Sequence, residues 1–168
     1  MTENGDSKML ENLRGKSLRS FAAAACLTAM AASPLRADID FLNASGIMPD
    51  GVPFSEAVRV GDTYYLSGQV GVVPGKLALV PGGMENEARQ TLENIGTVLA
   101  RYGLGFDNVV KCTVMLADMS EWGAFNDIYR SYFTPPYPAR SALGTNGLAL
   151  DARVEVECIA AADQSPAS

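Results

Sequence analysis

Residues 136–160 read PYPARSALGTNGLALDARVEVECIA, and the end of this stretch decides which fold the chain can adopt. Glu155 and Glu157 alternate with valine and cysteine, so the glutamates share one face of a strand and the apolar side chains share the other. A charged side chain inside an apolar core is costly unless it has a partner. The glutamate face must therefore meet water, a ligand or another subunit.

Arg140 follows closely spaced prolines in the same stretch. Pro138 restricts the backbone just before the arginine, which helps to hold a long side chain in one place. A guanidinium stays charged and offers a planar fork that matches a carboxylate. Glu155 follows across the loop GTNGLALD, which predicts two adjacent strands that bring Arg140 and Glu155 to one cleft. The alternative is a structural Arg140–Glu155 salt bridge, or two separately solvated side chains.

The rest of the chain predicts an α+β domain with the element order βββαβαββ. Alternation and turn signals predict strands over 39–43, 55–60, 63–67, 109–117, 140–144 and 153–161. Apolar residues at helical spacing predict a helix over 84–102 and a second one with Ser120 as its N-cap. The aromatic residues of the second helix are interpreted as core. We expect both helices to pack on one face of a mixed β-sheet.

The composition restricts the chemistry. With 168 residues and 48% hydrophobic content, the chain can form one ordinary core. It contains no histidine, which removes the commonest general base and zinc ligand. It also lacks nucleotide-binding glycine motifs, so neither a metal nor another cofactor is expected. A net charge of −6 disfavours a nucleic-acid partner.

The three cysteines, Cys26, Cys112 and Cys158, show no CxxC spacing. Two of them fall within predicted strands, where the favoured interpretation is a small buried thiol. A Cys112–Cys158 disulfide is the alternative.

Residues 1–37 have the layout of a secretory signal. Basic residues precede the uncharged run FAAAACLTAMAA over 21–32, and small residues follow it. This run is too short to cross a bilayer as a permanent helix, so no membrane association beyond export is expected. Cleavage is predicted after Ala37, with Ser33 as the second choice, which would deliver a periplasmic or secreted protein.

The alternative for this segment is an unstructured extension of a cytoplasmic protein. In both cases the folded domain is expected over 38–162, with 163–168 as a flexible C-terminal tail.

Four motifs resemble the RidA/YjgF family of enamine and imine deaminases. They are Ser67-Gly68-Gln69, the segment FNDIYRSYF around Asn126, Pro138-Ala139-Arg140-Ser141, and Val154-Glu155-Val156-Glu157. The match covers nearly all of residues 38–162 with consistent spacing. The resemblance implies a chorismate-mutase-like α+β fold and a homotrimer with clefts between neighbouring subunits. It also implies hydrolysis of small carboxylate-bearing imines, such as 2-aminoacrylate-like intermediates, to 2-oxo acids and ammonia.

The resemblance also assigns roles to individual residues. In the clefts between subunits, Arg140 holds the substrate carboxylate and Glu155 orients or activates the attacking water. Four residues are expected to bind substrate: Ser67, Gly68, Phe54 and Asn126. Ser67 and Gly68 line the same pocket, and Asn126 lies near the subunit contact. A neighbouring Arg140 would also favour the ionised form of Glu155.

Two positions depart from the family pattern. Phe54 stands where characterised deaminases often have tyrosine, and Ala142 stands where many have cysteine. Loss of the tyrosine hydroxyl favours an alternative function, a non-catalytic trimeric module that binds small carboxylates. A third reading is the RNA-cleaving activity attributed to some relatives, which the acidic composition opposes.

Overall fold

The structure is a computed structural model that describes residues 37–162. Apart from Ala37, the predicted signal segment lies outside the described residues, as do Cys26 and the predicted tail over 163–168. Across the described range, no helix combines the length and the apolar character needed to cross a membrane.

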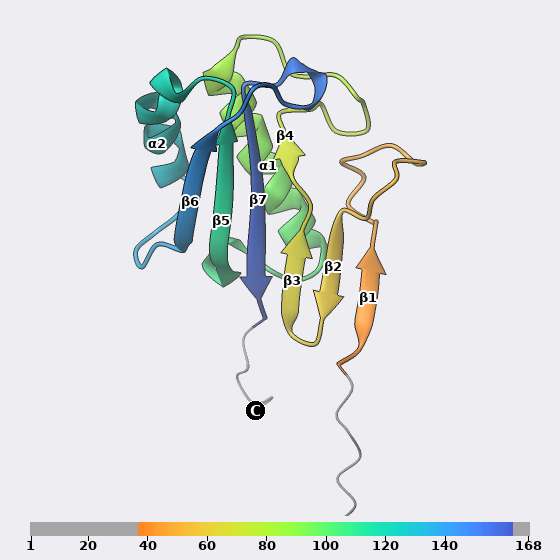
Figure 1. The fold of residues 1–168 in the computed structure, drawn as a ribbon. Coiled ribbons are helices and arrows are strands. Elements are labelled where there is room, and N and C mark those ends of the chain that lie inside the picture. The colour runs from red at the N-terminus through yellow and green to blue at the C-terminus, as the bar shows by residue number, and fades with distance from the viewer. Residues whose placement is uncertain (1–36, 163–168) are drawn as a thin grey trace, which may run out of the picture. The chain divides into compact units, whose positions relative to one another are not determined.

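Within residues 37–162, seven strands and two α-helices follow one another in the order ββββαβαββ (Figure 1). The strands are β1 (Ile39–Leu42), β2 (Ala57–Val60), β3 (Thr63–Leu66), β4 (Gln69–Val70), β5 (Val109–Leu116), β6 (Ala139–Gly144) and β7 (Val154–Ala161). The helices are α1 (Met84–Arg101) and α2 (Trp122–Arg130). The predicted α+β class is confirmed. The structure adds β4, a two-residue strand that local alternation does not reveal.

One mixed sheet contains all seven of these strands in the described part of the chain. Its order is β1-β2-β3-β7-β5-β6, and β4 pairs with β7 as well. β5 and β6 run parallel, whereas the other pairs are antiparallel. The prediction that the arginine and glutamate strands are adjacent is wrong, because β5 lies between β6 and β7.

The helices cover one face of the sheet and bury its apolar side chains. α1 crosses behind β4 and β7 in Figure 1, and α2 packs against α1. Leu92, Ile95 and Leu99 recur at helical spacing on α1 and are buried. They belong to the same core as Val154 and Val156 of β7. Fully burying one such side chain stabilises the fold by about 1.5–3 kcal/mol.

The core also contains a disulfide. Cys112 on β5 lies directly opposite Cys158 on β7, and both cysteines are buried. A disulfide joins them. The favoured prediction of buried free thiols is therefore wrong for this pair, and the alternative is confirmed. The physical reason is the strand register, which places both cysteines opposite each other on the core side.

The register of β5 and the start of α2 each show a local irregularity. Val110 is exposed although it lies in an alternating strand, because the β5–β7 register shifts between Val109 and Lys111. Ser120 does not cap α2 with its side chain. Its backbone N–H instead donates to the Asp118 carboxylate at 2.8 Å, in a 3-10 turn that precedes the helix.

Candidate active site

Glu155 and Glu157 lie on the face of the sheet that the helices leave open. Their neighbours Val154 and Val156 are buried, whereas Glu155 is half-buried and Glu157 is exposed. This confirms the prediction from alternation. The open face is where water, a ligand or another subunit can reach Glu155.

A cavity of about 260 Å³ surrounds Glu155, and we call it the glutamate cavity. It is lined by Met48, Phe54, Ser67, Gly68, Val70, Ala149 and Glu155. Three of the predicted substrate-binding residues thus lie together with the predicted catalytic acid. Phe54 comes from the loop before β2, and Ser67 and Gly68 come from the connection between β3 and β4.

The Glu155 carboxylate lies directly over Gly68. A Cβ atom placed on Gly68 would stand 2.1 Å from Glu155 Oε1, which is far shorter than a van der Waals contact. Only a residue without a side chain therefore leaves the carboxylate in this position. The glycine lets the backbone of the β3–β4 connection form the floor beneath the acid.

The environment of Glu155 raises its pKa above the ordinary glutamate value. Burial is the main cause, and the negative charge of Glu157 adds to it. The expectation that Arg140 favours the ionised form of Glu155 does not hold within one chain. Burial and the charge of Glu157 determine the direction of the pKa shift there. A carboxyl group with a raised pKa is better suited to accept a proton and return it near neutral pH.

A second buried carboxylate, Glu56, holds the walls of the glutamate cavity. The Glu56 side chain is nearly inaccessible and binds the loop after β1 and the end of α1. Its carboxylate accepts hydrogen bonds from the backbone N–H groups of Ala44 (2.8 Å) and Ser45 (2.9 Å), and from the hydroxyl groups of Ser45 and Tyr102. The Glu56 carbonyl accepts the N–H of Ser67 at 2.9 Å. The segment that carries Phe54 is thereby tied to the floor of the cavity.

Arg140 lies in a different cavity, of about 420 Å³, which we call the arginine cavity. Its lining residues are Trp122, Asn126, Tyr129, Arg130, Tyr137, Pro138 and Arg140. The Arg140 guanidinium carbon lies 4.6 Å from the ring centre of Trp122 and 4.5 Å from that of Tyr129. Its Nη2 donates to Asn126 Oδ1 at 2.7 Å. Two cation–π contacts and a hydrogen bond thus fix the guanidinium.

The contacts that hold the Arg140 guanidinium come mainly from one face of α2, and the sequence predicted them only in part. Trp122, Asn126 and Tyr129 stand at positions i, i+4 and i+7 of α2, so they share one helix face. Tyr129 is buried core, as interpreted, but its ring also faces the arginine. Burial raises the pKa of Tyr129 to about 12, against the opposing effect of Arg140, so the ring stays neutral beside the cation. Asn126, predicted to bind substrate, contacts Arg140 itself.

One chain does not bring Arg140 and Glu155 to a common cleft. The two cavities share no lining residue. Arg140 pairs with Cys112 on the core side of the sheet, whereas Glu155 points to the open side. Among residues 37–162, the two side chains form no ion pair with each other. The alternative of an intramolecular structural salt bridge is therefore wrong.

Comparison with known proteins gives consistent matches. A family model described as Endoribonuclease L-PSP matches residues 48–162. A mouse protein named 2-iminobutanoate/2-iminopropanoate deaminase is 50% identical over 108 residues, which cover 64% of this chain and 80% of the mouse protein. The human protein of that name is 44% identical, with 64% and 79% covered.

Solved structures agree with the fold. RidA from an Antarctic Psychrobacter species is 33% identical with a TM-score of 0.68, over 73% of this chain and 99% of that one. E. coli TdcF, solved with bound serine, is 26% identical with a TM-score of 0.68, over 74% and 99%.

Gly68→Ala tests whether the position of the Glu155 carboxylate matters. The added methyl group meets the end of a flexible side chain, so we expect the fold to tolerate it while the carboxylate moves away. Displacement by about 1 Å lowers turnover by roughly 100-fold where a catalytic group needs a fixed position. The measurement is imine hydrolysis beside a thermal melt. A wild-type rate in a protein that retains its melting temperature would contradict this reading of the contact.

Proposed function

This chain belongs to the Endoribonuclease L-PSP family, to which RidA/YjgF proteins belong, and we propose that it hydrolyses reactive enamine and imine intermediates that carry a carboxylate. The products are 2-oxo acids and ammonia. The observation that carries the proposal is the Glu155 carboxyl, half-buried above Gly68 with a raised pKa. Relatives with 44–50% identity are named for this reaction, which supports it.

The reaction needs few protein groups. An imine carbon conjugated to a carboxylate is already electrophilic, so positioning and proton transfer are the main requirements. Glu155 takes a proton from water as the water oxygen bonds to the imine carbon, and this proton passes to nitrogen to give a carbinolamine. Glu155 then moves the hydroxyl proton of the carbinolamine to nitrogen as well, so that the carbon–nitrogen bond breaks and ammonia leaves as the carbonyl forms. Arg140 holds the substrate carboxylate through the guanidinium edge opposite the Asn126 bond. Serine bound to TdcF also carries an α-carboxylate, in line with such an anchor.

We infer that the active protein is a homotrimer whose clefts combine Arg140 of one subunit with Glu155 of its neighbour. The two residues lie on opposite faces of one sheet, so a single chain cannot apply both to one substrate. The open face also exposes large apolar side chains, including Phe41, which is 71% exposed, and Tyr65 and Leu143. Exposed apolar area of this kind favours burial against another subunit.

Mixed trimers test the shared cleft. Subunits with Arg140→Lys and subunits with Glu155→Gln are each expected to be nearly inactive alone. After unfolding and refolding together in equal amounts, about a quarter of all clefts would combine an intact arginine with an intact glutamate. We therefore expect about that fraction of wild-type turnover to return. Light scattering should give about three times the monomer mass. No recovery from verified mixed trimers would contradict a cleft between subunits.

Separate substitutions distinguish catalysis from binding alone. Arg140→Lys keeps a charge but loses the fork, so carboxylate binding and turnover should fall together by roughly 10- to 1,000-fold. Glu155→Gln should lower turnover by on the order of 100-fold or more with little change in the affinity for a 2-oxo acid. Imine loss can be followed with amino acids that an amino-acid oxidase converts to imines. Turnover that survives Glu155→Gln would rule out the proposed mechanism and leave only a carboxylate-binding module.

The raised pKa of Glu155 gives the same variant a pH signature. Its neutral form is favoured in the folded chain, so its stabilising contribution is present at low pH and is lost as the pH rises through the folded pKa. Glu155→Gln should therefore match or exceed the wild-type melting temperature near pH 7, with the difference shrinking as the pH falls. Wild-type turnover should decline on the acid side as Glu155 becomes protonated.

We propose that the protein is exported, with residues 1–37 removed. The order of basic, apolar and small residues supports this, and so does the Cys112–Cys158 disulfide, because disulfides persist mainly in oxidising compartments. Intact mass of the protein isolated from its native cell is expected to correspond to a chain that begins at Asp38. A full-length cytoplasmic species with two free thiols at these positions would contradict export.

We propose small molecules as substrates and no nucleic-acid partner, although the family description contains the word endoribonuclease. A net charge of −6 repels the phosphate backbone of RNA. Salt-sensitive RNA binding by the purified trimer would restore the alternative.

A further inference from the structure

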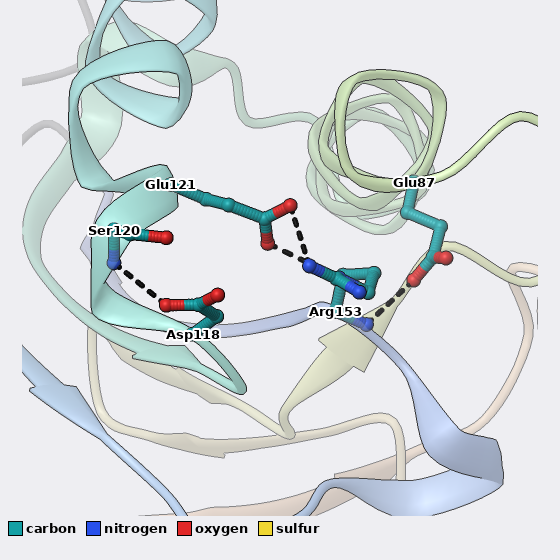
Figure 2. A network of polar contacts seen from close by, with 5 residues as sticks. All are labelled: Glu87, Asp118, Ser120, Glu121 and Arg153. Atoms are coloured by element: carbon teal, nitrogen blue, oxygen red, sulfur yellow. Dashed lines mark hydrogen bonds and ion pairs between the residues drawn. The ribbon is translucent and has the colours of Figure 1, made fainter.

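A buried carboxylate outside both cavities lies beside the strand that carries Glu155. Glu87 on α1 is 6% exposed, and its Oε2 accepts the backbone N–H of Arg153 at 2.7 Å (Figure 2). Arg153 stands two residues before Glu155 and directly before β7. A buried carboxylate is costly unless it has hydrogen-bond partners. This one fixes the backbone at the start of β7.

Arg153 is also held on two other sides. Its guanidinium donates to both carboxylate oxygens of Glu121, at 3.1 Å and 2.6 Å, and its carbonyl accepts the N–H of Ala117 at 3.0 Å. The Asp118 carboxylate shapes the turn that presents Glu121, as Figure 2 shows. Two other parts of the chain, α1 and the connection over 117–121, therefore meet at Arg153, and Glu87 provides the contact from α1.

Glu87 also lies where α1 packs tightly against the chain just after β4, the strand that pairs with β7 at Glu155. A Cβ atom on Gly71 would stand 2.7 Å from the Cα of Glu87, so the backbone there lies directly against the helix. Val70, the preceding residue, pairs with Glu155 in the sheet. The same helical turn thus supports β7 through Arg153 and β4 through Gly71.

The loop before Arg153 needs such support. Leu150 and Asp151 both have φ of 60°, a left-handed conformation that residues with side chains rarely adopt. Backbone of this kind persists where surrounding contacts fix it. Ala149 in this loop lines the glutamate cavity, so the end of the loop and the position of Glu155 are set together.

We propose that Glu87 is a positioning residue for Glu155. By holding the Arg153 N–H, it sets the start of β7 so that the Glu155 carboxylate lies over Gly68. Glu87 lines neither cavity and exchanges no proton with substrate. This inference rests on the proposed function of Glu155 as the proton acceptor.

Three single variants of the processed protein test the proposal. Glu87→Ala removes the acceptor, so kcat should fall by roughly 10- to 100-fold, while the affinity for 2-oxobutanoate changes little because Arg140 is unaffected. Glu87→Gln keeps one acceptor oxygen for the Arg153 N–H and should restore most of kcat. Glu85→Ala removes an exposed acid from the same turn of α1 and should leave kcat unchanged.

A double variant separates positioning from general stability. If Glu87 acts through Glu155, then adding Glu87→Ala to Glu155→Gln should lower kcat by less than about 2-fold further. A loss as large as in the wild-type background would overturn the proposal. So would a loss of kcat in Glu87→Ala that equals the loss of folded protein, or no loss at all.

A measurement that does not depend on turnover distinguishes a failure of the positioning role from a failure of the proposed function. Carbon-13 NMR of labelled glutamate, assigned with Glu155→Gln, reports the titration of the Glu155 carboxyl. In Glu87→Ala its pKa should fall toward the ordinary value as the carboxyl leaves the cavity. An unchanged titration would refute the positioning role even in an active enzyme. Conversely, a shifted titration in a protein without imine hydrolysis would support the positioning role and refute the proposed function.

Discussion

The two-sided character of β7 is the constraint on which the rest of the structure depends. Because β7 pairs with β3, β4 and β5, it must bury one row of side chains against α1. Val154 and Val156 supply that row, and alternation then forces Glu155 onto the opposite face. The hydrophobic effect that fixes the strand therefore also fixes the direction of the acid, and a one-residue slip would bury two carboxylates.

The two side chains of the proposed site are held in two different ways. The cation of Arg140 is held by aromatic rings and an amide on α2, which leaves part of its hydrogen-bonding edge available. The position of Glu155 comes from backbone that other carboxylates fix. Glu56 ties down the connection below it, and Glu87 ties down the strand start beside it. The proposed site thus depends on two buried acids that line neither cavity.

Periodic features could be read from the sequence, whereas strand order could not. Alternation identified the face of Glu155, and helical spacing identified α1. The separation of β6 from β7 could not be predicted, because the strand between them is β5, which comes from an earlier part of the chain. The Cys112–Cys158 pairing depended on that same insertion. The contact of Trp122 with Arg140 could not be predicted, because an aromatic helix face also suits an ordinary core.

The placement of Arg140 and Glu155 on opposite faces has a consequence for how such a protein behaves as it is diluted. A single chain carries both Arg140 and Glu155, but the two side chains cannot contact the same substrate molecule. If the active cleft lies between subunits, as proposed, specific activity should follow the association equilibrium and fall steeply once the protein concentration drops below the dissociation constant of the assembly. In that case the reaction rate in a compartment would rise more steeply than the concentration of the protein, because a higher concentration also raises the assembled fraction.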